Sequence, residues 1–207
     1  MQQTIVTLDL EGVLVPEIWI AVAERSGIEG LRLTTRDVPD YNVLMQGRLA
    51  ILDEHKLTLA DIQGVIASLS PLPGAKAFLD ELRGLTQVII LSDTFEEFAQ
   101  PFMRQLDWPA LFCHRLEVTP DGRVSGYRLR QENQKQKAVA SLKSLNYRVI
   151  AAGDSFNDTT MLMEADAGFF FHAPPAIRAQ FPQFQAFDDY GELLTAIRAA
   201  MGGNVAK

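Results

Sequence analysis

Three short apolar segments of the chain are separated by longer stretches with helical periodicity. The apolar segments are aliphatic or β-branched and cover residues 4–8, 88–91 and 148–152. Nearly continuous runs of this length are typical of parallel strands that are buried on both faces, and the run at 169–171 predicts a fourth strand. Alternation of such strands with helices predicts an α/β fold with a doubly wound, Rossmann-like parallel sheet.

The intervening segments carry the apolar spacing and the end residues of helices. Gly27 marks the end of the first helix, and Thr58 with Asp61 resembles a capping box at the start of another. Pro120-Asp121-Gly122, between alternating residues, predicts a hairpin. Helices are predicted at residues 17–26, 41–54, 58–68, 75–83, 95–106, 135–145, 159–165 and 189–201, the hairpin at 116–129, and a frayed tail at 202–207.

The stretch between the first two strands is longer than a crossover connection requires. It contains three extra predicted helices, and it ends in Pro71, Pro73 and Gly74, which interrupt regular structure. The length of 207 residues suits one domain that carries a large insert. We therefore predict a helical cap at residues 17–72, inserted into a catalytic core formed by residues 1–16 and 73–207.

Composition and charge exclude several classes of protein. The chain has 19 Lys and Arg against 26 Asp and Glu, a net charge of −7, which disfavours nucleic acid and anionic membranes as partners. Its single cysteine, Cys113, allows neither an intrachain disulfide nor a cysteine-rich zinc site, and we expect it to be a buried apolar residue. The N-terminus lacks a basic leader, and no stretch reaches the ~20 apolar residues of a membrane helix. We expect a soluble, cytoplasmic protein.

Polar clusters follow the first three predicted strands. Because the carboxyl ends of parallel strands share one edge of the sheet, these clusters should converge on one crevice. Four acids in one crevice repel one another and predict a hard divalent cation with oxygen ligands, Mg²⁺. The alternative is that each acid is solvated or caps the next helix. The clusters are Asp9-Leu10-Glu11-Gly12, Ser92-Asp93-Thr94 and Gly153-Asp154-Ser155-Phe156-Asn157-Asp158.

Such a site suits phosphoryl transfer. A carboxylate that is neutralised by a metal ion can act as a nucleophile and form an aspartyl-phosphate. The reaction mostly needs positioning and neutralisation of charge, which a hydroxyl donor such as Ser92 and a lysine would supply. The sequence contains neither a Gly-x-x-x-x-Gly-Lys loop nor a Gly-x-Gly-x-x-Gly motif, so we expect no nucleotide-phosphate cradle.

Taken in order, the same clusters resemble the four motifs of the haloacid dehalogenase superfamily. The resemblance covers nearly the whole chain, including the cap, and within the superfamily the chain is similar to the phosphoserine phosphatase branch. It resembles the subgroup of that branch that also transfers phosphate to homoserine, for which the stretch from Leu8 to Trp19 is typical. The motifs are Asp9-Leu10-Glu11-Gly12-Val13, Ser92 after Val88-Ile89-Ile90-Leu91, a lysine before the next strand, and Gly153-Asp154-Ser155-Phe156-Asn157-Asp158.

The resemblance implies a role for each matching residue. Asp9 would be the nucleophile that is phosphorylated, and Glu11 would be the acid and base that also offers its backbone carbonyl to Mg²⁺. Asp154 would bind the metal directly, and Asp158 would act through water. The phosphate end of the substrate would be held by Ser92, Asp93, Asn157 and a lysine.

Two lysines are candidates for the phosphate site. Lys135 and Lys137 lie two residues apart at the start of one predicted helix, about 200° around its axis, so both cannot face the phosphate equally. The spacing in the family favours Lys135. The alternative makes Lys137, or both residues, ordinary surface lysines.

The cap is expected to hold the amino-acid end of the substrate. Arg48 lies four residues from Leu44 and from Leu52, on an apolar helical face where it would suit bidentate capture of a carboxylate. The alternative is an arginine whose head reaches water at the seam between cap and core. Glu17 would pair with an ammonium group, as the family uses a glutamate there, or would simply favour the start of a helix. To bind a zwitterion such as phosphoserine, the site needs a positive group for the carboxylate and a negative group for the ammonium.

Glu11 departs from most phosphatases of this superfamily, which carry aspartate at the matching position. The extra methylene moves the carboxyl group by about a C–C bond length, and displacements of ~1 Å are costly in catalysis. We therefore predict transfer to homoserine as well as to water, with phosphoserine and homoserine as small-molecule partners. The resemblance also suggests a homodimer. The alternatives are a phosphatase for another small phosphomonoester, and a phospho-accepting module like a receiver domain.

Other reactive or aromatic residues are expected to be structural. The three histidines, His55, His114 and His172, show no metal-ligand spacing. Trp19, in the first cap helix, either packs in the core or lines the substrate pocket.

Overall fold

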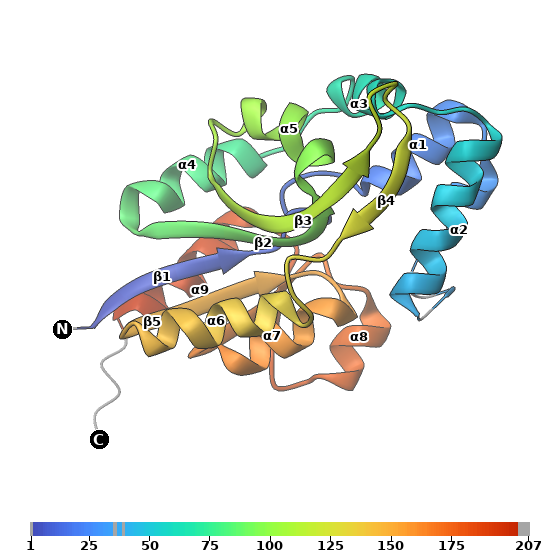
Figure 1. The fold of residues 1–207 in the computed structure, drawn as a ribbon. Helices are drawn as coiled ribbons and strands as arrows, with labels where there is room; N and C mark the ends of the chain where they lie inside the picture. Colours follow the sequence, from blue (N-terminus) through green and yellow to red (C-terminus); the bar gives the residue numbers. More distant parts are fainter. Residues whose placement is uncertain (1, 35–36, 39, 203–207) are drawn as a thin grey trace.

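The computed structural model describes residues 2–34, 37–38 and 40–202, so most of the predicted tail, at 203–207, lies outside the described residues. Within them, seven strands form one sheet in the order β4-β3-β2-β1-β5-β6-β7 (Figure 1). All neighbouring strands are parallel except β3 and β4. The strands are β1 (Gln3–Leu8), β2 (Gln87–Phe95), β3 (Ala110–Val118), β4 (Val124–Arg128), β5 (Tyr147–Gly153), β6 (Ala167–Phe171) and β7 (Gln185–Phe187).

The predicted helices are present, with ends that differ from the predictions by at most two residues. Helix α8 and strand β7 were not predicted, because each is too short to show a period. No helix in the described part of the chain is long and apolar enough to cross a membrane. The helices are α1 (Ile18–Ser26), α2 (Tyr41–Glu54), α3 (Leu59–Ala67), α4 (Ala75–Leu85), α5 (Glu96–Gln105), α6 (Gln134–Ser144), α7 (Thr159–Glu164), α8 (Pro175–Gln180) and α9 (Tyr190–Gly202), with 3₁₀ turns at Glu29–Arg32 and Phe156–Asp158.

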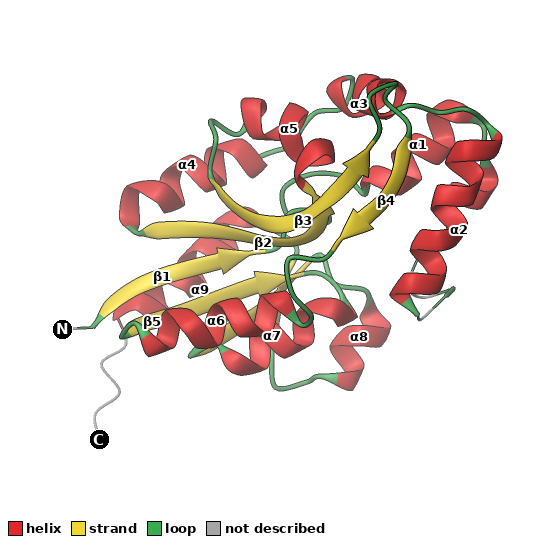
Figure 2. Cartoon of the chain, viewed as in Figure 1, coloured by secondary structure: helices red, strands yellow, loops and turns green. Residues whose placement is uncertain are grey.

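Successive side chains of a strand point to opposite faces of the sheet. Helices cover both of these faces (Figure 2). On β1, Val6 and Leu8 pack into the larger core with α4, α5 and α9. Ile5 of β1 and Phe170 of β6 pack into the second core with α6, α7 and α8. Full burial of one such side chain contributes about 1.5–3 kcal/mol to stability. The predicted doubly wound parallel sheet is confirmed.

Strand β2 continues past its predicted end at residue 91, and its last part is irregular. Between Leu91 and Phe95, β2 takes four residue steps where its partner β3 takes two. A bulge of this kind re-aims side chains, and bulges are common beside active sites. The Ser92-Asp93-Thr94 cluster therefore lies within the strand, and not after it as the apolar run alone predicted.

Strands β3 and β4 form the predicted hairpin around Pro120-Asp121-Gly122. β3 begins at Ala110, and not at residue 116 as predicted. The prediction missed the first part of the strand because the polar pair His114 and Arg115 interrupts its apolar pattern. The hairpin extends toward the helices of the predicted cap (Figure 1).

Helices α1, α2 and α3 lie beyond the carboxyl ends of the strands (Figure 1). α3 packs against α5, where the Gln63 side-chain amide donates to the Glu97 backbone carbonyl at 2.7 Å. After α3 the chain returns to the sheet, and the Leu72 amide donates to the Leu14 carbonyl at 2.9 Å. The helices predicted for the cap are therefore placed over the strand ends at which the polar clusters lie.

Candidate active site

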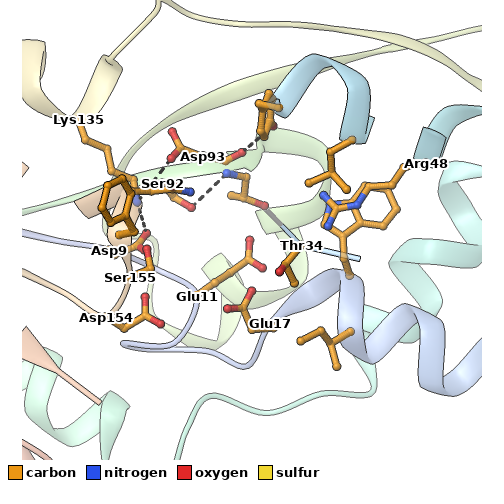
Figure 3. Close-up of a pocket in the computed structure, with 17 residues that line it drawn as sticks. Asp9, Glu11, Glu17, Thr34, Arg48, Ser92, Asp93, Lys135, Asp154 and Ser155 are labelled. Atoms are coloured by element: carbon orange, nitrogen blue, oxygen red, sulfur yellow. Dashed lines mark hydrogen bonds and ion pairs between the residues drawn. The ribbon is translucent and has the colours of Figure 1, made fainter. Parts of the chain in front are cut away.

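A pocket between the strand ends and helices α1 and α2 brings together most of the predicted site residues (Figure 3). The strand ends and the start of α6 form its floor, and helices α1 and α2 form the opposite wall. Asp158 is the one predicted residue that is not among the described residues lining the pocket, because it is fully buried next to Lys135. The predicted residues that line the pocket are Asp9, Glu11, Glu17, Arg48, Ser92, Asp93, Lys135, Asp154 and Asn157.

Lys135, near the start of α6, is buried among the acids. Its Nζ lies 2.9 Å from Asp9 Oδ1 and 2.7 Å from Asp158 Oδ1, and Asp93 Oδ2 is 3.8 Å away. Burial alone would lower the pKa of Lys135, but the three carboxylates raise it well above its usual range, so the lysine stays charged. Lys137, the alternative in the sequence, is exposed.

Asp9, Asp154 and Asp158 form a group of buried carboxylates, with oxygen atoms within 4.8 Å of one another. Burial raises the pKa of Asp9 well above its usual range, and the charges of Asp158 and Asp154 raise it further, while Lys135 partly offsets them. One lysine against three acids leaves negative charge that a divalent cation would neutralise. The oxygen donors and their charge therefore fit Mg²⁺, the ion predicted from the sequence.

Asp158 is already well supplied with hydrogen-bond donors. Its Oδ2 accepts from the backbone amides of Asp154 and Ser155, each at 3.0 Å, and from the Ser155 hydroxyl at 3.1 Å, while its Oδ1 accepts from the lysine. Gly153 allows this close approach, because a Cβ there would lie 2.4 Å from the Asp158 carboxyl carbon. Asp9 and Asp154 are therefore better placed than Asp158 to bind a metal ion directly.

Gly12 is required by the loop that follows β1. Its φ of +76° lies in the left-handed region, and a Cβ there would lie 2.4 Å from Asp154 Oδ2. The Gly12 amide donates to the Val15 carbonyl at 2.8 Å, which closes the loop on itself. Glycine thus lets the loop that carries Glu11 lie directly against the Asp154 carboxylate.

The bulge in β2 presents Ser92 and Asp93 to the pocket, and Gln134 holds the bulge in place. The Gln134 side-chain amide donates to the Ser92 carbonyl at 2.6 Å and to Asp93 Oδ1 at 3.1 Å. Burial alone would raise the pKa of Asp93, but Lys135 and His114 hold it well below its usual range. Sequence reasoning missed the roles of Gln134 and His114. The position of Gln134 next to the lysine was the single available clue.

Glu11 lies beside Glu17 in the pocket (Figure 3). Its Oε2 accepts from the Ile18 amide, at the start of α1, at 2.8 Å. Burial, followed by the charge of Glu17, raises the pKa of Glu11 to about 7. Among the described residues, the side-chain group that could hold a metal ion consists of Asp9, Asp154 and Asp158, and the Glu11 carboxyl group lies outside it in the same pocket. Glu17 lines the pocket, and its side chain makes no capping hydrogen bond within the described chain.

Replacing Glu17 with glutamine is expected to stabilise the ligand-free protein at pH 8 and not at pH 5. Because the pKa of Glu11 is raised in the folded state, the folded protein binds more protons than the unfolded chain between the usual glutamate pKa and about 7. The free energy of unfolding therefore falls as pH rises through that range. Removing the charge of Glu17 lowers the pKa of Glu11 and recovers part of this loss.

Thermal unfolding at both pH values measures this effect. Glu54→Gln, at an exposed glutamate of α2, is the matched control. An equal shift at pH 5 and pH 8 would show that repulsion between the two carboxylates is not its cause.

Arg48 of α2 is buried, with its head inside the protein. The guanidinium lies over the Trp19 ring, 4.5 Å from the ring centroid, and donates to the Leu33 carbonyl at 2.7 Å. Its Nε is buried and has no hydrogen-bond partner among the described residues. Burial lowers the pKa of Arg48 to about 10, which leaves it charged at neutral pH. A buried, charged and incompletely bonded guanidinium at the pocket wall is suited to bind an anionic group, unlike an arginine head directed to water.

The residues that were expected to be structural differ in burial and in their contacts. Trp19 fits both of its proposed roles, because it lines the pocket and packs edge-on against Phe98, with ring centroids 5.2 Å apart. His114 is buried, and its Nδ1 accepts from the Arg130 amide. Cys113 is half-buried, and not buried as predicted, because it lines a surface hollow with Leu129 and Arg130. Burial raises the pKa of its thiol to about 12.

The chain matches known proteins along most of its length. The model of the haloacid dehalogenase-like hydrolase family matches residues 4–166. Phosphoserine phosphatase ThrH of Pseudomonas aeruginosa is 62% identical over 189 residues, which cover 91% of this chain and 92% of that protein. A phosphoserine phosphatase of Pseudomonas syringae pv. tomato is 63% identical over 189 residues, which cover 91% and 80%. A solved phospho-aspartyl intermediate analogue of phosphoserine phosphatase has a TM-score of 0.77 at 19% identity, covering 95% of this chain and 99% of that one.

These matches agree with the class that the sheet and the carboxylate pocket define. The chain belongs to the haloacid dehalogenase-like hydrolase family. Within that family it is a phosphomonoester hydrolase, and it belongs to the phosphoserine phosphatase branch that its sequence motifs resemble.

Proposed function

We propose that this enzyme is a Mg²⁺-dependent phosphoserine phosphatase that also transfers the phosphoryl group of phosphoserine to homoserine, through an aspartyl-phosphate on Asp9. The layout of the pocket carries the proposal (Figure 3). Its floor holds the buried Asp9 carboxylate with Lys135 and Ser92, and its wall holds Glu17 and Arg48. One end suits a phosphate group, and the other suits the ammonium and carboxylate groups of an amino acid.

The names of the relatives support this substrate and intermediate. Both Pseudomonas proteins are named phosphoserine phosphatases, and the solved structure is named as a phospho-aspartyl intermediate analogue. We also propose that residues 17–72 act as a cap over a core of residues 1–16 and 73–207. The support is that α1 and α2 supply the wall of the pocket that faces the strand ends.

In the first half of the reaction, Asp9 would attack the phosphorus atom with a carboxylate oxygen. A bond between that oxygen and phosphorus forms as the bond from phosphorus to the serine oxygen breaks, and Glu11 gives its proton to the leaving oxygen. A pKa of about 7 lets Glu11 hold that proton at neutral pH. Lys135, Ser92 and Asn157 would hold the oxygens of the transferred group and offset their charge.

In the second half, the same glutamate would act as a base. Glu11 takes a proton from water, or from the homoserine hydroxyl, as that oxygen attacks phosphorus and the bond to Asp9 breaks. The products are inorganic phosphate or phosphohomoserine, and both carboxyl groups return to their starting states. The hydrogen bond from the Ile18 amide keeps Glu11 on the cap side of the pocket, where either acceptor would bind.

Asp9, Asp154 and the backbone carbonyl of Glu11 would hold Mg²⁺, and Asp158 would act through water. When bound, the ion neutralises the acids and stabilises charge on the phosphate oxygens. Asp158 also fixes Lys135 through their 2.7 Å contact, so it would orient the phosphate-binding lysine.

Arg48→Ala is expected to raise the KM for phosphoserine by about ten- to hundredfold, because a charge-assisted hydrogen bond contributes about 1.5–3 kcal/mol. The KM for p-nitrophenyl phosphate, which has no carboxylate, should stay close to that of the wild type. Steady-state kinetics with both substrates measure the difference. Arg25→Ala, at an exposed arginine of α1, is the matched control. Equal losses on both substrates would argue against a role in carboxylate recognition.

The proposed function is tested by phosphate release from a panel of phosphomonoesters with Mg²⁺, with and without homoserine. We expect a preference for phosphoserine, loss of activity on chelation of the metal, and formation of phosphohomoserine. A preference for another small phosphomonoester would replace the substrate. Uptake of a single phosphate per chain without turnover would indicate a receiver-like module, and the absence of phosphohomoserine would overturn the transfer reaction.

A further inference from the structure

The β3–β4 hairpin of the core makes contacts with the cap helices outside the pocket. The Leu59 amide, at the start of α3, donates to the Gly122 carbonyl in the hairpin turn at 2.9 Å. Arg123 Nη1 lies 3.4 Å from Asp53 Oδ1, near the end of α2. These contacts join the tip of the hairpin to the junction between α2 and α3.

A second set of contacts, made by Tyr127 of β4, reaches the start of α2. The Tyr127 hydroxyl donates to Asn42 Oδ1 at 2.5 Å. Its ring packs edge-on against Tyr41 and against Phe95 of β2, with ring centroids 6.0 Å apart in each pair. The Tyr41 hydroxyl in turn donates to the Asp93 carbonyl, in the β2 bulge, at 3.2 Å. Tyr127 therefore joins the first turn of α2 to the strand that carries part of the site.

Helix α2 is the element that carries Arg48 into the pocket wall. Tyr41 and Arg48 are seven residues apart, about two helical turns, so they lie on the same face of the helix. Both of them, together with Leu44, line the pocket. Because a continuous helix transmits displacement along its length, a shift of the first turn would also shift the Arg48 side chain.

We propose that Tyr127 is a positioning residue for substrate binding, because it holds the first turn of α2 and thereby sets the position of Arg48. Tyr127 itself is not among the described residues that line the pocket. The inference rests on the proposed function in one respect, namely the use of Arg48 to bind the substrate carboxylate. The link between Tyr127 and α2 does not depend on which substrate is bound.

Tyr127→Phe removes the hydroxyl and keeps the ring. We expect the KM for phosphoserine to rise by about fivefold, the loss predicted for one hydrogen bond, with kcat and the KM for p-nitrophenyl phosphate close to wild type. Asn42→Ala should raise the KM for phosphoserine to a similar extent. Asn42→Asp keeps an acceptor oxygen, so its KM for phosphoserine should stay near that of the wild type. In an Arg48→Ala background, Tyr127→Phe should raise the KM no further. Tyr147→Phe, at the opposite end of the sheet, is the matched control.

Hydrogen exchange of the α2 amides gives a second readout that needs no substrate. In Tyr127→Phe these amides should exchange faster, while those of β5 keep the wild-type rate. An unchanged KM for phosphoserine would overturn the proposal, and so would equal rises in KM for both substrates, which indicate general loss of structure. If the wild type does not turn over phosphoserine, the proposed function fails. In that case, faster exchange of the α2 amides in Tyr127→Phe would still support the link between Tyr127 and α2. Unchanged exchange would overturn that link too.

Discussion

Asp9→Asn is expected to abolish phosphate release, with a loss of at least about 10⁴-fold in kcat, because an amide oxygen is a poor nucleophile. The variant should fold, since asparagine has nearly the same shape as aspartate. Its side-chain oxygen can still accept from the Leu10 amide, which lies 2.7 Å from Asp9 Oδ1, and from the Lys135 ammonium. The loss therefore reports chemistry and not structure.

Steady-state turnover of phosphoserine and the mass of acid-quenched enzyme together measure this loss. The wild type should gain the mass of one phosphoryl group during turnover, and the Asp9→Asn variant should not. Asp107→Asn, at an aspartate that is 70% exposed, is the matched control and should behave as the wild type. Substantial turnover by the Asp9→Asn variant would refute Asp9 as the nucleophile.

Lys135→Met is expected to reduce both activity and stability. The Lys135 ammonium is buried between Asp9 and Asp158, so its removal leaves two carboxylates without their shared cation. Removing one partner of a buried ion pair typically lowers the free energy of unfolding by about 3–5 kcal/mol. Loss of the charged donor that we propose for the transferred phosphoryl group should also lower kcat by about 10²–10³-fold.

Chemical denaturation and steady-state kinetics measure the two effects of Lys135→Met. Lys137→Met is a close control, because it is the same substitution two residues away at an exposed position. It should leave both measurements near wild type. Similar behaviour of the two variants would mean that burial among the acids does not set the importance of Lys135.

The centre of the fold could be predicted from the sequence, and its edges could not. β1 and β5 are buried on both faces, so their apolar runs are nearly unbroken and identify them. β3 carries His114 and Arg115 in its middle, and these polar residues hide the first part of the strand from a search for apolar runs. The extension of β2 through its bulge depends on pairing with β3, and no local pattern records that pairing.

The candidate site shows a similar division. The choice of Lys135 over Lys137 rested on the spacing in the family that the motifs resemble, whereas Asp9 and Asp154 could be proposed from the strand ends that they follow. The separation of Glu11 from the carboxylate group could not, since it depends on the loop that Gly12 closes. Gln134 and Tyr127 make their hydrogen bonds to segments that are distant in the sequence, so their residue types alone carry no indication of a role.

The central position of β1 has a consequence for how the enzyme folds. β1 is the first strand of the chain, yet its neighbours β2 and β5 come much later, and Leu8 is in register with Ala152. Contacts of such long sequence separation are slow to form, because a large loop must close first. The Asp9 and Asp154 carboxylates follow these two strands and approach each other only when β5 docks. The return of activity during refolding would therefore report the docking of β5 and not the early collapse of the chain.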